Sequence, residues 1–200
     1  MPKGDAEEGA EGERVMDKII IEKSNMGDTR TADTMPTLVE FAKANDKHRA
    51  NVVVLMSNFA RDIQKRAHEH DWTKADEPYR SQFYQAMVLT MQAGQDFTES
   101  EWSKHHISIE RHHLNKRVPV DVNLIDVIEM ICDCVEAAAA RSGELRYGID
   151  LPDEVLQNAV KNTVQMVWDS VVLRGWEDKK DDCDDILSER LWLAENGEEG

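Results

Sequence analysis

Histidine is concentrated in the middle of this chain, where all seven histidines fall between His48 and His113. His70 is followed directly by Asp71 in the run His-Asp-Trp-Thr-Lys, which ends at Lys74. An imidazole supplies a neutral nitrogen ligand, and an adjacent carboxylate can bridge two ions or hold a water molecule. This doublet predicts a divalent-metal site, although a lone histidine on an apolar helix face is more often a hydrogen-bonded core residue.

Four further histidines lie within nine residues, at His105, His106, His112 and His113. The pairs 105/112 and 106/113 are each separated by seven positions, close to two helical turns, so a continuous helix would align each pair on one face. Such a pair can ligate one ion directly or through water. A solvated, histidine-rich surface helix is the competing interpretation, but a structural role would leave several imidazole groups in need of polar partners.

Three acidic residues, Asp126, Glu129 and Asp133, occupy a segment that is otherwise largely apolar. On a helix they share a narrow arc, because positions i, i+3 and i+7 lie within about 60° of one another. A solvent face is the simplest interpretation. The nearby histidines favour a carboxylate face turned toward a metal pocket instead, and either aspartate can close that site.

The order of these histidines and acids resembles the HD-domain superfamily of metal-dependent phosphohydrolases, whose pattern is H…HD…D. The order is His48, His70-Asp71, His105, His112-His113 and Asp133. The H-D-x-x-K variant ending at Lys74 is like that of cyclic-dinucleotide phosphodiesterases, in which the lysine contacts phosphate. The finer order of H-D-x-[ST]-K, W-x-x-H, R-H-H and I-D-x-I-E-M-x-x-D is similar to an uncharacterised phage-encoded family over roughly residues 45–141.

The resemblance implies a metal-dependent phosphohydrolase, of nucleotidase or phosphodiesterase type, that attacks a nucleotide or related phosphoester with a metal-activated water. Its cofactor is expected to be one or two divalent ions of Mn, Fe, Co, Zn or Mg. The implied metal ligands are His48, His70, Asp71, His105, His112 and Asp133. The implied catalytic residues are Asp71 and Lys74, and the implied substrate contacts are Lys74, Glu77, Arg111 and His113.

Two other classes of function stay open at this point. The same set of histidines and aspartates also resembles the HD-type mixed-valent di-iron oxygenases, which bind iron and consume oxygen. A degenerate HD fold that binds a nucleotide or a host protein without turnover is the second alternative.

Helices must position most of these residues, and we expect an all-α, HD-domain-like helical bundle. Apolar periodicity and the residues Gly94, Pro119, Gly143 and Pro152 predict its helices at about 37–45, 48–70, 77–93, 99–114, 121–142 and 152–174. In the second of these helices a buried stripe is expected at Val52, Leu55, Met56, Phe59 and Ile63. In the last, core packing is expected at Val155, Leu156, Ala159, Val160 and Val164. Residues 19–21 form the one strand-like run.

The formal net charge is −16, and the acids are concentrated at the two ends. We therefore divide the chain into an acidic tail and linking segment at 1–35, the HD-like domain at 36–176 and an acidic tail at 177–200. Such a charge argues against binding to duplex nucleic acid, which needs clustered basic residues. The expected partner is a small phosphorylated substrate, most simply a nucleotide, and a homo-oligomer is compatible with the sequence.

The chain is expected to act in the cytoplasm, which would be that of a host cell if a phage encodes it. Its sequence contains no apolar stretch near 18 residues and no signal-peptide pattern at its acidic start, so neither membrane insertion nor secretion is expected. The three cysteines are odd in number, and two of them are only two positions apart, which argues against a disulfide framework.

Overall fold

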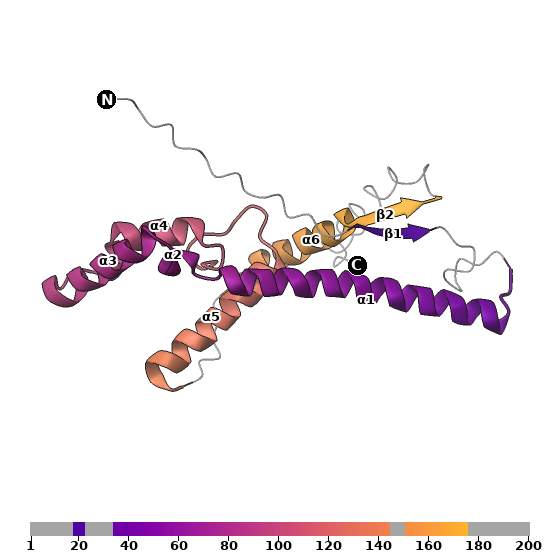
Figure 1. The fold of residues 1–200 in the computed structure, drawn as a ribbon, viewed down its shortest axis with the longest axis horizontal. Coiled ribbons are helices and arrows are strands. Elements are labelled where there is room, and N and C mark those ends of the chain that lie inside the picture. Colours follow the sequence, from indigo (N-terminus) through magenta and orange to yellow (C-terminus); the bar gives the residue numbers. More distant parts are fainter. Residues whose placement is uncertain (1–17, 23–33, 145–150, 176–200) are drawn as a thin grey trace, which may run out of the picture. The chain divides into compact units, whose positions relative to one another are not determined.

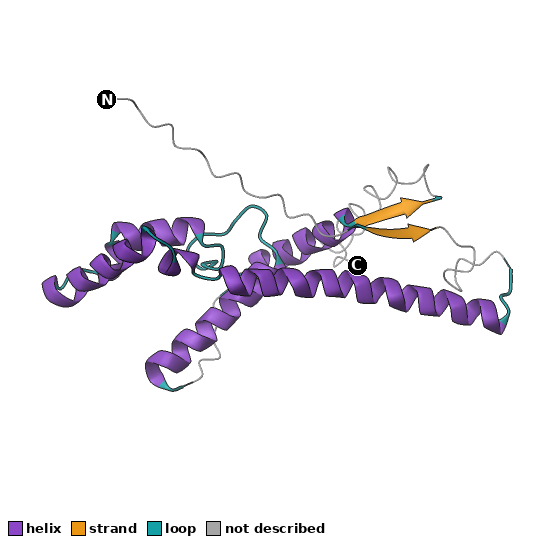
Figure 2. Cartoon of the chain, viewed as in Figure 1, coloured by secondary structure: helices purple, strands orange, loops and turns teal. Residues whose placement is uncertain are grey.

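The computed structural model describes residues 18–22, 34–144 and 151–175, and these are predominantly helical, as we predicted (Figures 1 and 2). The chain divides into two compact units. Among the described residues, one unit comprises 18–22, 34–54 and 169–175, and the other, which we call the site unit, comprises 55–144 and 151–168. Both boundaries between the units, after residues 54 and 168, fall inside the helical domain predicted at 36–176. Nearly all of the two predicted acidic tails lies outside the described residues.

The helices have these bounds: α1 (Leu38–Glu69), α2 (Trp72–Ala75), α3 (Tyr79–Ala93), η1 (Phe97–Glu99), a single 3-10 turn, α4 (Glu101–Ile109), α5 (Leu124–Ser142) and α6 (Asp153–Asp169). Among the described residues, none of these helices combines the length and the apolar character that crossing a membrane requires.

A parallel pair of short strands accompanies the helices. β1 (Ile19–Glu22) pairs with β2 (Val171–Arg174), with Ile19 aligned with Val171. The strand-like run is therefore confirmed. The prediction that the last helix continues to residue 174 is wrong, because the apolar, mostly β-branched residues after Ser170 extend and pair with β1.

One continuous helix, α1, replaces the two helices predicted between residues 37 and 70. It begins at a capping arrangement in which the Thr37 and Glu40 backbone amides each donate to the other residue's side chain, at 2.9 and 3.3 Å. The predicted buried stripe is wrong at Val52 and Met56, which are exposed. Its other members, Leu55, Phe59 and Ile63, lie in the site unit and are half-buried.

The core of the site unit joins α5, α6 and the loop that precedes α5. Its buried members are Leu114, Val122, Val127, Met130, Val155 and Ala159. On α6 the buried residues recur every four positions at Val155, Ala159 and Thr163, whereas the predicted core residues Leu156, Val160 and Val164 are exposed. The predicted packing face of α6 is therefore too broad, and the helix buries a single narrow stripe.

The start of α5 is held firmly, which matters because this helix carries the acidic residues. Asn123 caps it by accepting from the backbone amides of Ile125 and Asp126, and the Asp126 side chain accepts from the Asn123 amide at 3.0 Å. Thr163 of α6 accepts from the Leu124 amide at 2.9 Å. These contacts set the rotation of α5, and with it the face on which its carboxylates lie.

Candidate metal centre

The His70-Asp71 doublet lies where α1 ends and the chain turns into α2. Asp71 adopts φ 54° and ψ 33°, a left-handed conformation that aspartate tolerates better than most residues. This bend points the two oxygens of Asp71 toward different groups of side chains. Lys74, three positions on, pairs with Oδ2 of Asp71.

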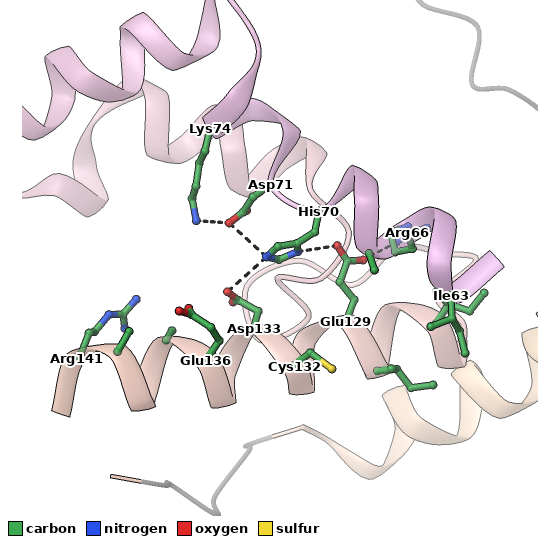
Figure 3. A pocket seen from close by; sticks show the side chains of 15 residues that line it. Ile63, Arg66, His70, Asp71, Lys74, Glu129, Cys132, Asp133, Glu136 and Arg141 are labelled. Carbon is green, nitrogen blue, oxygen red and sulfur yellow. Dashed lines mark hydrogen bonds and ion pairs between the residues drawn. The ribbon is translucent and has the colours of Figure 1, made fainter. Parts of the chain in front are cut away.

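A first set of ligand atoms gathers around Oδ2 of Asp71, and we call it the pocket set: His70, Asp71 and Asp133. Nε2 of His70 lies 3.4 Å from Asp71 Oδ2 and 3.7 Å from Asp133 Oδ1, and Figure 3 shows the imidazole between the two carboxylates. All three residues line a pocket of about 520 Å³. One nitrogen and two carboxylate oxygens therefore converge at a surface that is open to a substrate.

A second set gathers around the other oxygen of Asp71, and we call it the imidazole set: His106, His112, His113 and Asp71. Asp71 Oδ1 lies 3.4 Å from Nε2 of His106 and 3.6 Å from Nε2 of His112. Nε2 of His113 lies 2.8 Å from Nε2 of His106. Asp71 thus offers one oxygen to each set, which is the arrangement of a carboxylate that bridges two ions.

Two atoms of the imidazole set are buried without a hydrogen bond. They are Oδ1 of Asp71 and Nε2 of His112, and neither has a hydrogen-bond partner among the described residues. Leaving a buried polar atom unsatisfied costs about 1–3 kcal/mol. Because an acceptor oxygen and an imidazole nitrogen both face the same point, a cation there would satisfy both atoms, and the residues fit a divalent metal.

Glu129, in the middle of α5, orients one imidazole of each set. Its Oε1 lies 3.0 Å from Nδ1 of His70 and 3.1 Å from Nδ1 of His112, while Oε2 accepts from Arg66 at 2.8 Å. A carboxylate acceptor keeps the proton on Nδ1 and leaves the lone pair of Nε2 for a metal. Burial raises the pKa of Glu129, but the hydrogen bonds from His112, Arg66 and His70 outweigh it and lower the pKa to about 2.

Thr73 of α2 does the same for His106. Its hydroxyl lies 2.6 Å from Nδ1 of His106 and donates to Oε1 of Glu110 at 2.8 Å. A hydroxyl has a single proton, so Thr73 must accept the Nδ1 proton of His106. The lone pair of His106 Nε2 then faces Asp71 and the other imidazoles.

The electrostatics of the imidazole set favour neutral rings at two positions. Burial and the neighbouring His113 lower the pKa of His106 to about 3. Burial and the neighbouring His112 lower the pKa of His113 to about 4. Burial also lowers the pKa of His112, but the hydrogen bond and charge of Glu129 outweigh it, so the net shift is upward. His106 and His113 are therefore ready to ligate as neutral rings, whereas at His112 a cation competes with a proton more strongly than it would at a free imidazole.

Four of the predicted metal ligands, His70, Asp71, His112 and Asp133, are brought together. His105 is not: its ring stacks on Tyr79 with centroids 5.1 Å apart, and its neighbour His106 faces Asp71 instead. Residues 112 and 113 belong to a loop, because α4 ends at Ile109 and Glu110 is extended. The seven-residue spacing therefore does not align them with His105 and His106 on one helical face.

None of the candidate ligand groups among the described residues includes His48, which is an exposed residue of α1 outside the site unit. The ligand role implied for His48 stays a prediction.

The predicted substrate contacts separate into two groups. Lys74 lines the pocket, and His113 belongs to the imidazole set. Glu77 is exposed and pairs with Arg80 at 2.9 Å. Arg111 pairs with Asp121 and Asp126. Neither Glu77 nor Arg111 is among the residues that line the pocket.

Asp126 is an internal anchor and lies outside both ligand sets. Its side chain is fully buried and accepts from Arg66 and Arg111, each at 2.7 Å. Of the two candidate aspartates, Asp133 is the one that faces His70. The interpretation of these acids as a solvent face is wrong for Asp126 and Glu129, which are both buried.

His106, Thr73, Glu110 and Glu129 lie at this site but are absent from the implied metal ligands, catalytic residues and substrate contacts. His106 was considered only in the 106/113 pair, and Glu129 only on the acidic arc of α5. The hydroxyl in the run H-D-x-T-K is the signal that points to Thr73. For Glu129, the signal is its position between the two candidate aspartates on one helical arc.

A family model described as a family of unknown function, DUF5662, matches residues 38–182. The chain belongs to this family. The DUF5662 match contains both ligand sets and the residues that orient them, so the candidate centre lies wholly within the family domain. Searches of curated proteins and of solved structures found no match.

The Glu129→Gln variant is expected to bind metal about 10–100-fold more weakly, because an amide is a poorer acceptor for two imidazole protons and presents N–H groups to Arg66. Calorimetric titration with Mn²⁺ and Zn²⁺ measures the loss. Glu154→Gln, at an exposed position in the first turn of α6, is the matched control. Equal affinities for wild type and Glu129→Gln would contradict the orienting role.

Proposed function

We propose that this DUF5662 chain is a metal-dependent phosphohydrolase of the HD-domain type that acts on a nucleotide or a related phosphoester. The observation that carries the proposal is the position of Asp71, which faces His70 and Asp133 with one side and His106 and His112 with the other. Ions held there would lower the pKa of a bound water and neutralise charge on a phosphoryl group.

The chain's own residues supply the positioning. Asp71 and the imidazoles hold the centre, and Glu129 and Thr73 fix the imidazole tautomers. Lys74 lines the pocket beside Asp71, where an ammonium group can contact a phosphoryl oxygen as negative charge develops on it (Figure 3).

The pocket also suits the organic part of such a substrate. Its volume of about 520 Å³ is within the range of small-molecule sites, about 300–1,000 Å³. Two charged residues, Glu136 and Arg141, lie along α5 beyond Asp133 (Figure 3). The apolar lining is Ile63, Ala67, Ile125, Ile128, Ala137 and Ala140. This pocket fits a substrate whose phosphate lies at the metal centre and whose partly apolar group packs against the apolar lining.

A cytoplasmic location is part of the proposal. Cys132 and Cys134 are free thiols, which is the usual state in a reducing compartment. Cys183 lies outside the described residues.

The test is a screen of nucleotides and other phosphoesters with the full chain loaded with Mn²⁺, Fe²⁺, Co²⁺, Zn²⁺ or Mg²⁺. We expect phosphate release, and a decrease in kcat/KM of about 100-fold in Lys74→Gln without loss of metal. Lys104→Gln, a surface lysine that pairs with Glu99 and Glu101, is the matched control.

Two results would contradict this function, and a third would contradict only the role of Lys74. Bound iron with oxygen consumption and no phosphate release would favour the oxygenase. Tight nucleotide binding without turnover would favour the non-catalytic module. Full hydrolysis by Lys74→Gln would remove lysine from the mechanism.

A further inference from the structure

The two ligand sets differ in their exposure. In the imidazole set, the side chains of His106 and His112 are 6% and 1% exposed, and His113 is half-buried. In the pocket set, the side chains of His70 and Asp133 are 28% and 26% exposed. His70 and Asp133 line the pocket, whereas His106, His112 and His113 do not. The two sets therefore differ in how easily water, chelators and substrates reach them.

They also differ in donor chemistry. The imidazole set offers three ring nitrogens and one carboxylate oxygen, all of them zinc-type ligands and four in number, as many as a tetrahedral site holds. The pocket set offers one ring nitrogen and two carboxylates. Imidazole-rich sites suit Zn²⁺ and similar borderline ions, whereas carboxylate and water ligands suit Mn²⁺ and Mg²⁺.

Two rings of the imidazole set are oriented before any ion arrives, whereas the pocket set has one such ring, that of His70, which Glu129 also holds. Thr73 fixes the ring of His106, and Glu129 fixes the ring of His112. Two of the four buried side-chain atoms that lack a hydrogen-bond partner among the described residues, on Asp71 and His112, belong to this set. A ligand group whose side chains are already oriented loses less conformational entropy on binding than a mobile one does.

We propose that the centre is asymmetric: the imidazole set retains one Zn²⁺-class ion tightly, and the pocket set takes a second, exchangeable ion of the Mn²⁺ or Mg²⁺ class that faces the substrate. This inference rests on the metal assignment of the proposed function and goes beyond it. His113, whose implied role was substrate contact, becomes a ligand of the retained ion.

The experiment loads the full chain with excess Zn²⁺ and Mn²⁺, dialyses it against a weak chelator and measures metal by elemental analysis. We expect one zinc and no manganese per chain, and manganese that rebinds on addition. His113→Gln is expected to lose the retained zinc, whereas Asp133→Asn keeps the zinc but binds manganese at least tenfold more weakly. His68→Gln, at an exposed position of α1 within the site unit, is the matched control and should behave as wild type.

X-ray absorption at the zinc edge of the wild-type chain gives a readout that does not depend on a variant folding. Three imidazoles on the retained zinc support the asymmetric centre. One imidazole, or equal retention of both metals, would overturn it and leave the proposed hydrolase intact. Failure to bind either metal would remove the proposed function as well, so the two failures are distinguishable.

Discussion

The Asp71→Asn variant is expected to lose both ions and at least about 1,000-fold in phosphoester hydrolysis. This residue alone is common to both ligand sets, with one oxygen near His70 and the other near His106 and His112. An amide cannot supply two anionic oxygens, so neither set keeps its full complement of ligands. Loss of several kcal/mol of metal-derived stabilisation corresponds to a decrease in rate of this size.

Asparagine is the substitution to use because of the backbone. Asp71 has φ 54°, and asparagine accepts this left-handed conformation, whereas alanine would add strain there. The far-UV circular dichroism of Asp71→Asn should therefore match wild type. The control is Asp76→Asn, an exposed aspartate at the end of α2, which should keep both metal and activity.

The measurements are metal content by elemental analysis and initial rates on the best substrate from the phosphoester screen. Retention of two ions with full turnover in Asp71→Asn would show that Asp71 does not bridge the centre. Retention of one ion with slow turnover would show that only one set depends on its carboxylate.

The doublet and the closing aspartate illustrate what the sequence could reveal. His70 and Asp71 are adjacent, so any fold places them together, and α5 has strong apolar periodicity and a clear N-cap. The resemblance to the residue order of HD-domain proteins pointed to Asp133, which lies near His70. These residues could be predicted from the sequence because adjacency and helical periodicity constrain their positions directly.

The choice between neighbouring histidines could not be made in this way. His105 and His106 differ by about 100° on a helix, and which of them faces Asp71 depends on how α4 packs against the turn at Thr73. The seven-residue spacing was misleading because α4 ends at Ile109. Tertiary packing decided this register, and no local pattern in the segment reports it.

The same limit applied to Asp126 and Asp133, which share one arc of α5. Their roles differ because two arginines, Arg66 from α1 and Arg111 from the loop after α4, converge on Asp126. Burial lowers the pKa of each arginine, but hydrogen bonds to the carboxylates outweigh it and the net shift is upward. A convergence of residues so distant in the sequence leaves no periodic signal.

This difference predicts opposite phenotypes for the two aspartates. Asp126→Ala is expected to lower the free energy of unfolding by about 3 kcal/mol, because it leaves two largely buried guanidinium groups without their shared carboxylate. It also removes the side chain that accepts from the Asn123 amide at the start of α5. Asp133→Ala, at a partly exposed position, is expected to change stability by less than about 0.5 kcal/mol.

The two variants should affect metal binding in the opposite order, with the larger loss in Asp133→Ala. Urea unfolding with excess chelator isolates the stability effect, because a bound ion would otherwise stabilise the folded state. Metal content measured on the folded fraction should then be preserved in Asp126→Ala and reduced in Asp133→Ala. If Asp126→Ala were stable but free of metal, Asp126 would be the ligand and Arg66 and Arg111 would have to release it. The present geometry argues against that outcome, since these arginines already satisfy both of its oxygens.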